Sequence, residues 1–158
     1  MNPDLMDRLK ETVDAGDLHL KRMNYARDQL SDYFPLDVDS YNLLDAEQIS
    51  FTDQLVFRFT KLQDLMGRKF FRLILESLEE DVENMAFIDM LSRLEKLNLL
   101  EDHQKWLELR EVRNLMAHEY PLQQEIFVDD LNELYNRCDE LAGIWESLKL
   151  FTLKRFNL

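Results

Sequence analysis

Cysteine, glycine and proline are all scarce in this sequence of 158 residues. Cys138 is the only cysteine, which excludes a disulfide framework and a cysteine-based zinc site and is typical of a reducing compartment. Three glycines and three prolines leave long stretches in which a helix can continue without a breaker. This lack of turn-forming residues argues against an all-β fold.

Long apolar runs are also missing. No window approaches the roughly 20 apolar residues that a membrane-spanning helix needs. The start, Met-Asn-Pro-Asp, lacks the basic head and apolar stretch of a secretory signal. We therefore expect a cytoplasmic protein with no membrane partner.

Common catalytic and cofactor motifs are absent as well. The sequence has no phosphate-binding glycine loop, no Gly-x-Ser-x-Gly turn and no His-Glu-x-x-His pair. Its three histidines, His19, His103 and His118, lie far apart, and the Glu-x-x-His signature of di-iron bundles is missing. We expect neither a metal site nor a cofactor.

Positive charge is in short supply. Nineteen lysines and arginines stand against 32 aspartates and glutamates, which gives a formal net charge of −13. Such a charge repels nucleic acid and acidic lipid headgroups, so an RNA-binding function requires a local basic patch.

Helical periodicity is the main positive signal. Apolar residues recur at three- and four-residue spacing in segments bounded by caps, prolines or acidic stretches. The predicted helices cover about residues 3–33, 48–78, 86–97, 102–120 and 124–151. The second should be the longest, and the third should turn Ile88, Leu91 and Leu94 inward. Short connections favour antiparallel neighbours, so we predict one all-α domain over residues 1–158, an antiparallel up-and-down bundle of about five helices.

Five cations cluster on the second predicted helix. Between residues 55 and 75 they fall in one arc of the helical wheel, about 100° wide, and Asp64 is the only acidic residue there. The five are Arg58, Lys61, Arg68, Lys69 and Arg72. Two interpretations are open: a solvated helix face, or a surface that attracts phosphate against the global charge.

The segment from Arg110 to Pro121 contains the side chains best suited to catalysis. Arg110, Asn114 and His118 recur every four residues and therefore share one stripe of a helix. His118 can give or take a proton near neutral pH, Arg113 offers a planar cation suited to phosphate, and Asn114 can hold the imidazole or a ligand. These groups suit phosphodiester chemistry. The alternative is an exposed stripe whose terminal histidine interacts with the helix dipole.

The string Arg113-Asn114-Leu115-Met116-Ala117-His118-Glu119-Tyr120 has the form Arg, four residues, His, any residue, Tyr. It resembles the signature of the HEPN superfamily, specifically the HepT-like ribonuclease toxins of toxin–antitoxin systems of the MntA/HepT type. Residues 106–112 are similar to the segment that precedes this motif in the family, and residues 53–65 are similar to the second helix of the family. The resemblance is best over about residues 50–145.

This resemblance implies a metal-independent endoribonuclease toxin that a cognate nucleotidyltransferase antitoxin neutralises, either by binding or by AMPylation of a tyrosine. The implied reaction is attack of a ribose 2′-hydroxyl on the adjacent phosphate of RNA. His118 would act as general acid or base, Arg113 would stabilise the transition state, and Asn114 would orient His118 or the phosphate. Tyr120 matches the position that receives AMP. Arg110 and the five cations of the second helix are candidates for RNA or anion binding.

A second function class stays open: a non-catalytic partner that binds nucleotide or substrate for a nucleotidyltransferase. We also predict a two-fold homodimer in which the motif helices face each other across a cleft. Arg113 and His118 are five residues apart, so on a regular helix they point about 140° apart. A site composed from two chains is therefore easier to build than a site within one chain.

Overall fold

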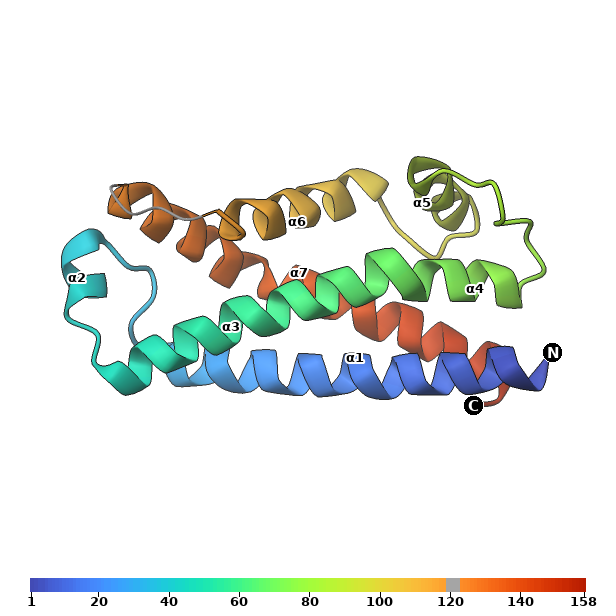
Figure 1. The fold of residues 1–158 in the computed structure, drawn as a ribbon, viewed down its shortest axis with the longest axis horizontal. Coiled ribbons are helices and arrows are strands. Elements are labelled where there is room, and N and C mark those ends of the chain that lie inside the picture. The colour runs from blue at the N-terminus through green and yellow to red at the C-terminus, as the bar shows by residue number, and fades with distance from the viewer. Residues whose placement is uncertain (119–122) are drawn as a thin grey trace.

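The computed structural model describes residues 1–118 and 123–158 (Figure 1). Its elements are α1 (Pro3–Leu30), α2 (Val38–Asn42), α3 (Ala46–Leu65), the π-helical turn η1 (Met66–Phe70), α4 (Phe71–Ser77), α5 (Phe87–Lys96), α6 (His103–Met116) and α7 (Gln124–Phe156). These described ranges contain no β-strand, so the predicted all-α class is confirmed.

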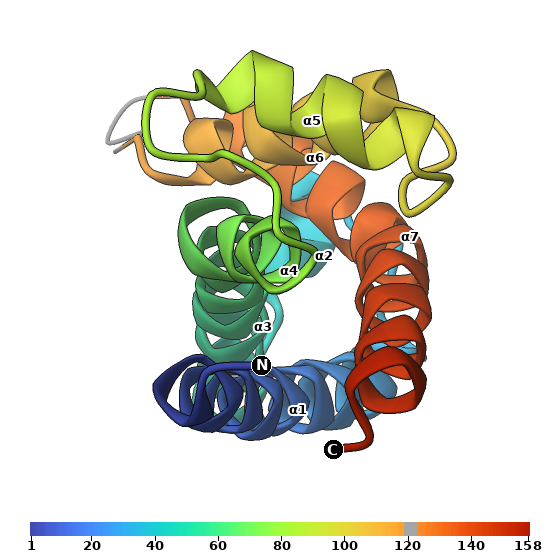
Figure 2. The same ribbon diagram turned by 90° about the vertical axis from the view of Figure 1, so that its right-hand side faces the viewer.

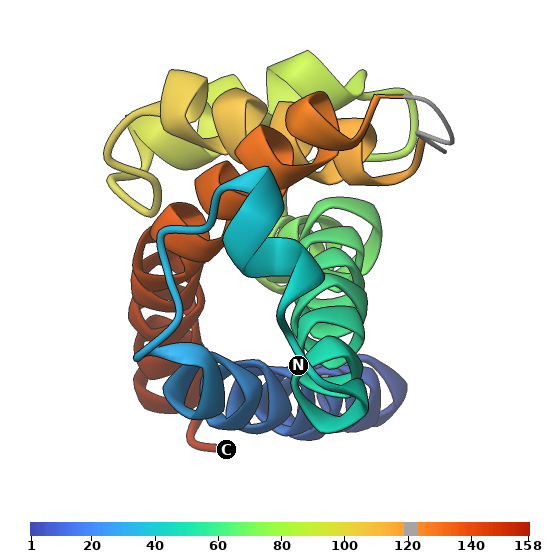
Figure 3. The same cartoon turned by 90° about the vertical axis from the view of Figure 1, so that its left-hand side faces the viewer.

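The long helices run up and down the length of the molecule. α1 and α3 lie side by side in opposite directions, α6 runs back along the far side of α3, and α7 returns diagonally so that the two chain ends lie near each other (Figure 1). Seen from either end, α1, α3 and α7 form three sides of the bundle, and α5 and α6 cover the fourth (Figure 2, Figure 3). The predicted antiparallel bundle is confirmed, with α5 lying across it.

Local sequence signals set several helix boundaries. The Asn2 side chain caps α1 ahead of Pro3, and Asp45 and Gln48 exchange hydrogen bonds in a capping box that starts α3. α7 continues for 33 residues until Asn157 adopts a left-handed conformation with φ of 54°. The longest helix is therefore α7 and not the second predicted helix, which η1 divides into shorter parts.

Two further expectations need correction. The stretch 35–45 lies between the first two predicted helices, where no helix was expected, but it contains the short helix α2, because Asp37 and Ser40 form their own capping box. Ile88 does not face inward: it is 49% exposed, and Met90 is buried in α5 together with Leu91 and Leu94. α5 crosses the fourth side of the bundle next to α6, and it buries only the face that meets the bundle (Figure 2).

Aromatic side chains fill much of the core. Trp106, Trp145, Phe59, Phe70 and Phe71 are fully buried. The Trp145 ring lies directly over Gly16 of α1, and its indole N–H donates to Asp17 at 3.0 Å. None of the described helices is both long and apolar enough to cross a membrane.

Candidate functional site

A pocket of about 150 Å³ lies where α3, η1, the start of α5 and α6 meet. Its lining residues are Gln63, Asp64, Gly67, Arg68, Phe87, Arg110, Arg113 and Asn114. At about 30 Å³ for each water molecule, this volume holds a few waters or one anion of phosphate size. The pocket therefore brings three residues of the 110–121 segment together with one cation of the second predicted helix.

Arg113 is held in a fixed orientation by Asp64. Its Nε donates to Asp64 Oδ1 at 3.0 Å and its Nη2 donates to Oδ2 at 3.1 Å. Nη1 lies 3.5 Å from Asn114 Oδ1. Both ion-pair side chains are 24% exposed. This bidentate geometry orients the guanidinium and offsets its charge, while Nη1 keeps a donor for a ligand.

Two other cations at the pocket lack such a partner. Arg68 and Arg110 are exposed and form no ion pair with a carboxylate of the described residues. The Arg110 guanidinium carbon lies 5.3 Å from the centre of the Phe87 ring, a cation–π contact that places it at the pocket edge. Arg68, Arg110 and Arg113 thus set three positive charges against the single carboxylate of Asp64.

Gln63 adds a buried amide to the same pocket. It is only 4% exposed, and its side chain makes no hydrogen bond within residues 1–118 and 123–158. The Gln63 amide is not among the buried side-chain atoms that lack a partner, so it keeps accessible surface and is a polar group that water or a ligand in the pocket can reach. Sequence reasoning missed Gln63, because its position next to the core face of the helix gave no chemical signal.

A π-helical turn forms part of the pocket wall through Gly67 and Arg68. A π turn accommodates an extra residue and is frequent at functional sites. Gly67 within η1 faces α6 closely: a Cβ there would lie 3.2 Å from Trp106 Cζ2. The absence of a side chain at Gly67 therefore leaves room for the Trp106 ring of α6 beside η1.

The structure separates the five cations of the second predicted helix. Arg68 lines the pocket, whereas Arg72 Nη1 donates to the carbonyl of Val82 at 2.8 Å. Lys69 is exposed within η1. The helical wheel that placed these side chains in one arc assumes about 100° per residue, and the π turn breaks that assumption after Leu65.

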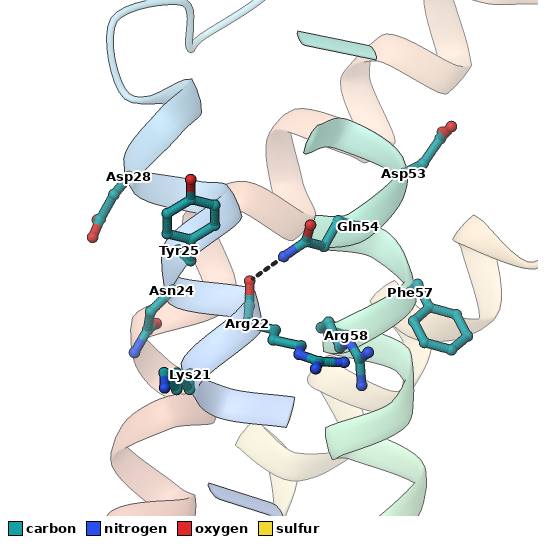
Figure 4. Close-up of a pocket in the computed structure, with 9 residues that line it drawn as sticks. All are labelled: Lys21, Arg22, Asn24, Tyr25, Asp28, Asp53, Gln54, Phe57 and Arg58. Atoms are coloured by element: carbon teal, nitrogen blue, oxygen red, sulfur yellow. Dashed lines mark hydrogen bonds between the residues drawn. The ribbon is translucent and has the colours of Figure 1, made fainter. Parts of the chain in front are cut away.

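The other two cations face α1. Arg58 Nη1 lies 3.0 Å from His19 Nδ1, in a wider groove between α1 and α3 (Figure 4). Lys61 is exposed, and its Nζ lies 5.4 Å from the centre of the Phe57 ring. These cations therefore belong to different surroundings from Arg68.

His118 lies beyond the end of its helix. α6 was expected to continue to about Tyr120 but ends at Met116, because Ala117 and His118 donate to the carbonyls of Asn114 and Leu115, three residues back, and tighten the last turn. His118 is exposed and is not part of the pocket wall. Tyr120, the predicted modification site, lies outside the described residues.

A group of possible metal-binding side chains lies at the opposite end of α6. Ligand atoms of Glu95, Asp102 and His103 lie within 4.8 Å of one another. Each has a local role: Asp102 caps α6, and Glu95 accepts hydrogen bonds from the backbone N–H and Nδ1 of His103 at 2.8 and 2.5 Å. These bonds lower the pKa of Glu95.

No protein family model, curated protein or solved structure matches this chain. The resemblance to the HEPN superfamily therefore rests on the motif residues themselves.

Proposed function

We propose that this chain is a metal-independent endoribonuclease toxin that acts in the cytoplasm and is neutralised by a nucleotidyltransferase. One observation carries the proposal: Arg68, Arg110 and Arg113 surround one pocket beside the end of the helix that leads to His118. Three guanidinium groups at one place, in a chain of net charge −13, match a phosphate ligand.

In the proposed reaction, His118 accepts the proton of a ribose 2′-hydroxyl. The 2′-oxygen then bonds to the adjacent phosphorus, and the bond from phosphorus to the 5′-oxygen breaks. A proton from an imidazolium passes to the leaving 5′-oxygen, so the products are a 2′,3′-cyclic phosphate and a 5′-hydroxyl. Arg113, oriented by Asp64, donates from Nη1 to a non-bridging oxygen on which negative charge develops.

A homodimer completes this site in the proposal. His118 lies outside the pocket that holds Arg113 and Asn114. A two-fold pair of α6 helices would allow each chain to present its His118 to the pocket of the other. Pairing would also double the local positive charge, which helps an acidic protein to attract RNA.

The antitoxin acts in the proposal through Tyr120, two residues after His118. An AMP group there would add a phosphate and a base two residues along the chain from His118. The phosphate could pair with the arginines that otherwise bind RNA, so one modification would fill the site and cancel its charge.

Cleavage of RNA by the purified chain tests the proposal. We expect wild type to cut single-stranded RNA in the presence of EDTA and to leave cyclic phosphate ends, and His118→Ala to lose at least a hundredfold in rate, as is roughly typical when a proton-transfer group is removed. His103→Gln, at the other end of α6, is the matched control and should cut like wild type. Equal cleavage by His118→Ala would contradict the catalytic assignment.

The bidentate pair of Arg113 and Asp64 favours one alternative, a non-catalytic partner that binds nucleotide for a nucleotidyltransferase. An arginine whose charge is offset by a carboxylate stabilises a transition state less well but can still position a ligand. This alternative predicts no cleavage and no toxicity when the chain is expressed alone, together with nucleotide binding that Arg110→Ala weakens.

A further inference from the structure

The groove between α1 and α3 has a volume of about 890 Å³, and charged and aromatic side chains lie among the residues that line it. Figure 4 shows Lys21, Arg22 and Arg58 gathered at one end, while Asp28 and Asp53 lie toward the other. The pKa of Arg58 is lowered by burial and by the nearby charge of Arg22, which agrees with two guanidinium groups that lie close together. One end of the groove is therefore positively charged although the whole chain is acidic.

His19 orients Arg58 without neutralising it. Arg58 Nη1 donates to His19 Nδ1 over 3.0 Å. Burial, and then the charges of Arg58, Lys61 and Arg22, lower the pKa of His19, so the imidazole is neutral at pH 7 and can accept this bond. The charge of Arg113 is offset by the carboxylate that holds it, whereas Arg58 is held by a neutral ring and its charge is not offset in this way. The α1–α3 groove thus offers a fixed and uncompensated guanidinium.

Two aromatic side chains flank these cations. Tyr25 of α1 is 54% exposed and Phe57 of α3 is 50% exposed. Both line the groove, and Figure 4 shows the Phe57 ring on the side of α3 away from Tyr25. The guanidinium carbon of Arg58 lies 5.0 Å from the centre of the Phe57 ring. Exposed aromatic rings beside cations are the combination by which proteins bind single-stranded nucleic acid, because bases stack on the rings and phosphates meet the cations.

The groove is continuous with the candidate site. Phe57 and Asp53 also line a groove of about 420 Å³ beside α6 and the start of α7, and Arg113 forms part of its wall. Arg113 in turn lines the small arginine pocket. Along α3, Phe57 and Asp64 are separated by roughly 10 Å at 1.5 Å per residue, the length of about three stacked nucleotides at 3.4 Å each.

We propose that the groove between α1 and α3 binds a nucleotide of single-stranded RNA, its base against Phe57 or Tyr25 and its phosphate at Arg22 and Arg58, and that the strand continues past Phe57 toward Arg113. Asp28 and Asp53 can accept hydrogen bonds from exocyclic amines of a base. The role of this groove as part of a substrate path rests on the proposed ribonuclease function, but the binding itself does not.

Fluorescence anisotropy with labelled single-stranded RNA of mixed sequence tests this proposal, with every variant built in a His118→Ala background so that cleavage cannot intervene. We expect Arg22→Ala/Arg58→Ala to weaken binding at least tenfold and to reduce the salt dependence by about one to two released ions. Phe57→Ala should weaken binding roughly five- to a hundredfold through lost stacking.

Matched controls separate specific contacts from net charge. Lys10→Ala/Lys154→Ala removes two exposed cations near the chain ends, and Ile88→Ala removes an exposed apolar side chain of α5. Both should bind RNA like the parent. Equal weakening by the control pair would overturn the proposal, and so would equally tight binding of double-stranded RNA or of polyglutamate that depends on the same groove residues.

The outcomes also distinguish this proposal from the proposed function. If RNA binding depends on the groove residues but the wild-type chain never cleaves RNA, the proposed RNA-binding groove is supported and the proposed ribonuclease function is refuted. RNA binding that is indifferent to Arg22, Arg58 and Phe57, together with unchanged cleavage when the same substitutions are made with His118 intact, overturns the proposed groove and leaves the ribonuclease proposal standing.

Discussion

The guanidinium of Arg113 and the carboxylate of Asp64, 49 positions apart in the sequence, form two parallel hydrogen bonds across the contact between α6 and α3. The resemblance to the HEPN superfamily assigns transition-state stabilisation to Arg113. Its partner Asp64 is the one acidic residue between positions 55 and 75, where five cations lie. It fixes where Arg113 points and limits the charge that it can offer.

The pair makes Arg113 a structural residue as well as a candidate catalytic one. Arg113 is not one of the buried residues of α6, so from its position on the helix alone Arg113→Ala would be expected to leave the fold unchanged. Removing the arginine leaves the Asp64 carboxylate three-quarters buried without its partner, so we expect a loss of about 1–2 kcal/mol in the free energy of unfolding. Adding Asp64→Asn should recover much of this loss. Urea unfolding of the two single variants and the double variant measures it, and additive losses would contradict the coupling.

Asp64→Asn alone should strengthen anion binding. Arg113 would then keep its orientation in part and regain its uncompensated charge, so we expect several-fold tighter binding of inorganic phosphate or RNA at the arginine pocket. Titration with phosphate under isothermal calorimetry checks this, with Asp89→Asn on α5 as an exposed control. Weaker binding would indicate that orientation of Arg113 matters more than its charge.

Gly16 and Gly143 form a matched pair for testing the packing. A Cβ at Gly16 would lie 2.0 Å from the ring of Trp145, which is fully buried, so Gly16→Ala should destabilise by about 1–3 kcal/mol or more. A Cβ at Gly143 meets nothing within 4 Å, so Gly143→Ala in the middle of α7 should stabilise by up to about 1 kcal/mol. Melting temperatures that move in the same direction for both would refute the packing of α1 on α7.

His19 should make stability depend on pH. Its pKa is lowered in the folded chain from the ordinary value of 6.5, so the unfolded chain binds the proton more readily. The associated stability is complete above pH 6.5 and falls as the pH drops through that value. Urea unfolding between pH 7.5 and 5 should show this fall, and His19→Gln should reduce it. The pKa values of Glu80 and Glu95 are lowered from 4.5, so these carboxylates titrate outside this window.

Cys138 should be chemically inert in the folded chain. It is fully buried, its Sγ donates to the carbonyl of Leu134 at 3.3 Å, and burial raises its pKa to about 12. Because the thiolate is the reactive form, we expect no reaction with a disulfide reagent at pH 8 and complete reaction in denaturant. Rapid labelling of the native chain would contradict this burial.

The predicted homodimer can be tested directly by light scattering. The chain has a mass of 19.0 kDa, so a dimer should show twice that mass at micromolar concentration. A strict monomer would argue against a site composed from two chains, and the catalytic proposal would then need His118 and Arg113 of one chain to meet.

The sequence alone determined the helical architecture, because its signals are local. Few breakers, apolar residues at helical spacing and side-chain caps such as Asn2 and Asp102 act within about four residues, which is the range of helix hydrogen bonds. The same locality explains how Arg113 and Asn114 could be assigned to one end of a helix before the fold was known.

Tertiary structure decided how the charges are used. The helical wheel placed five cations of the second predicted helix on one face, but the packed helices give them different surroundings: Arg58 meets His19 of α1, Arg68 lines the pocket beside α6, and Arg72 donates to the carbonyl of Val82. Asp64 reaches Arg113 across 49 positions, and His19 reaches Arg58 across 39. Whether an arginine is neutralised by a carboxylate or held by a neutral ring depends on which helices pack together, and helical spacing carries no information about residues so far apart in the chain.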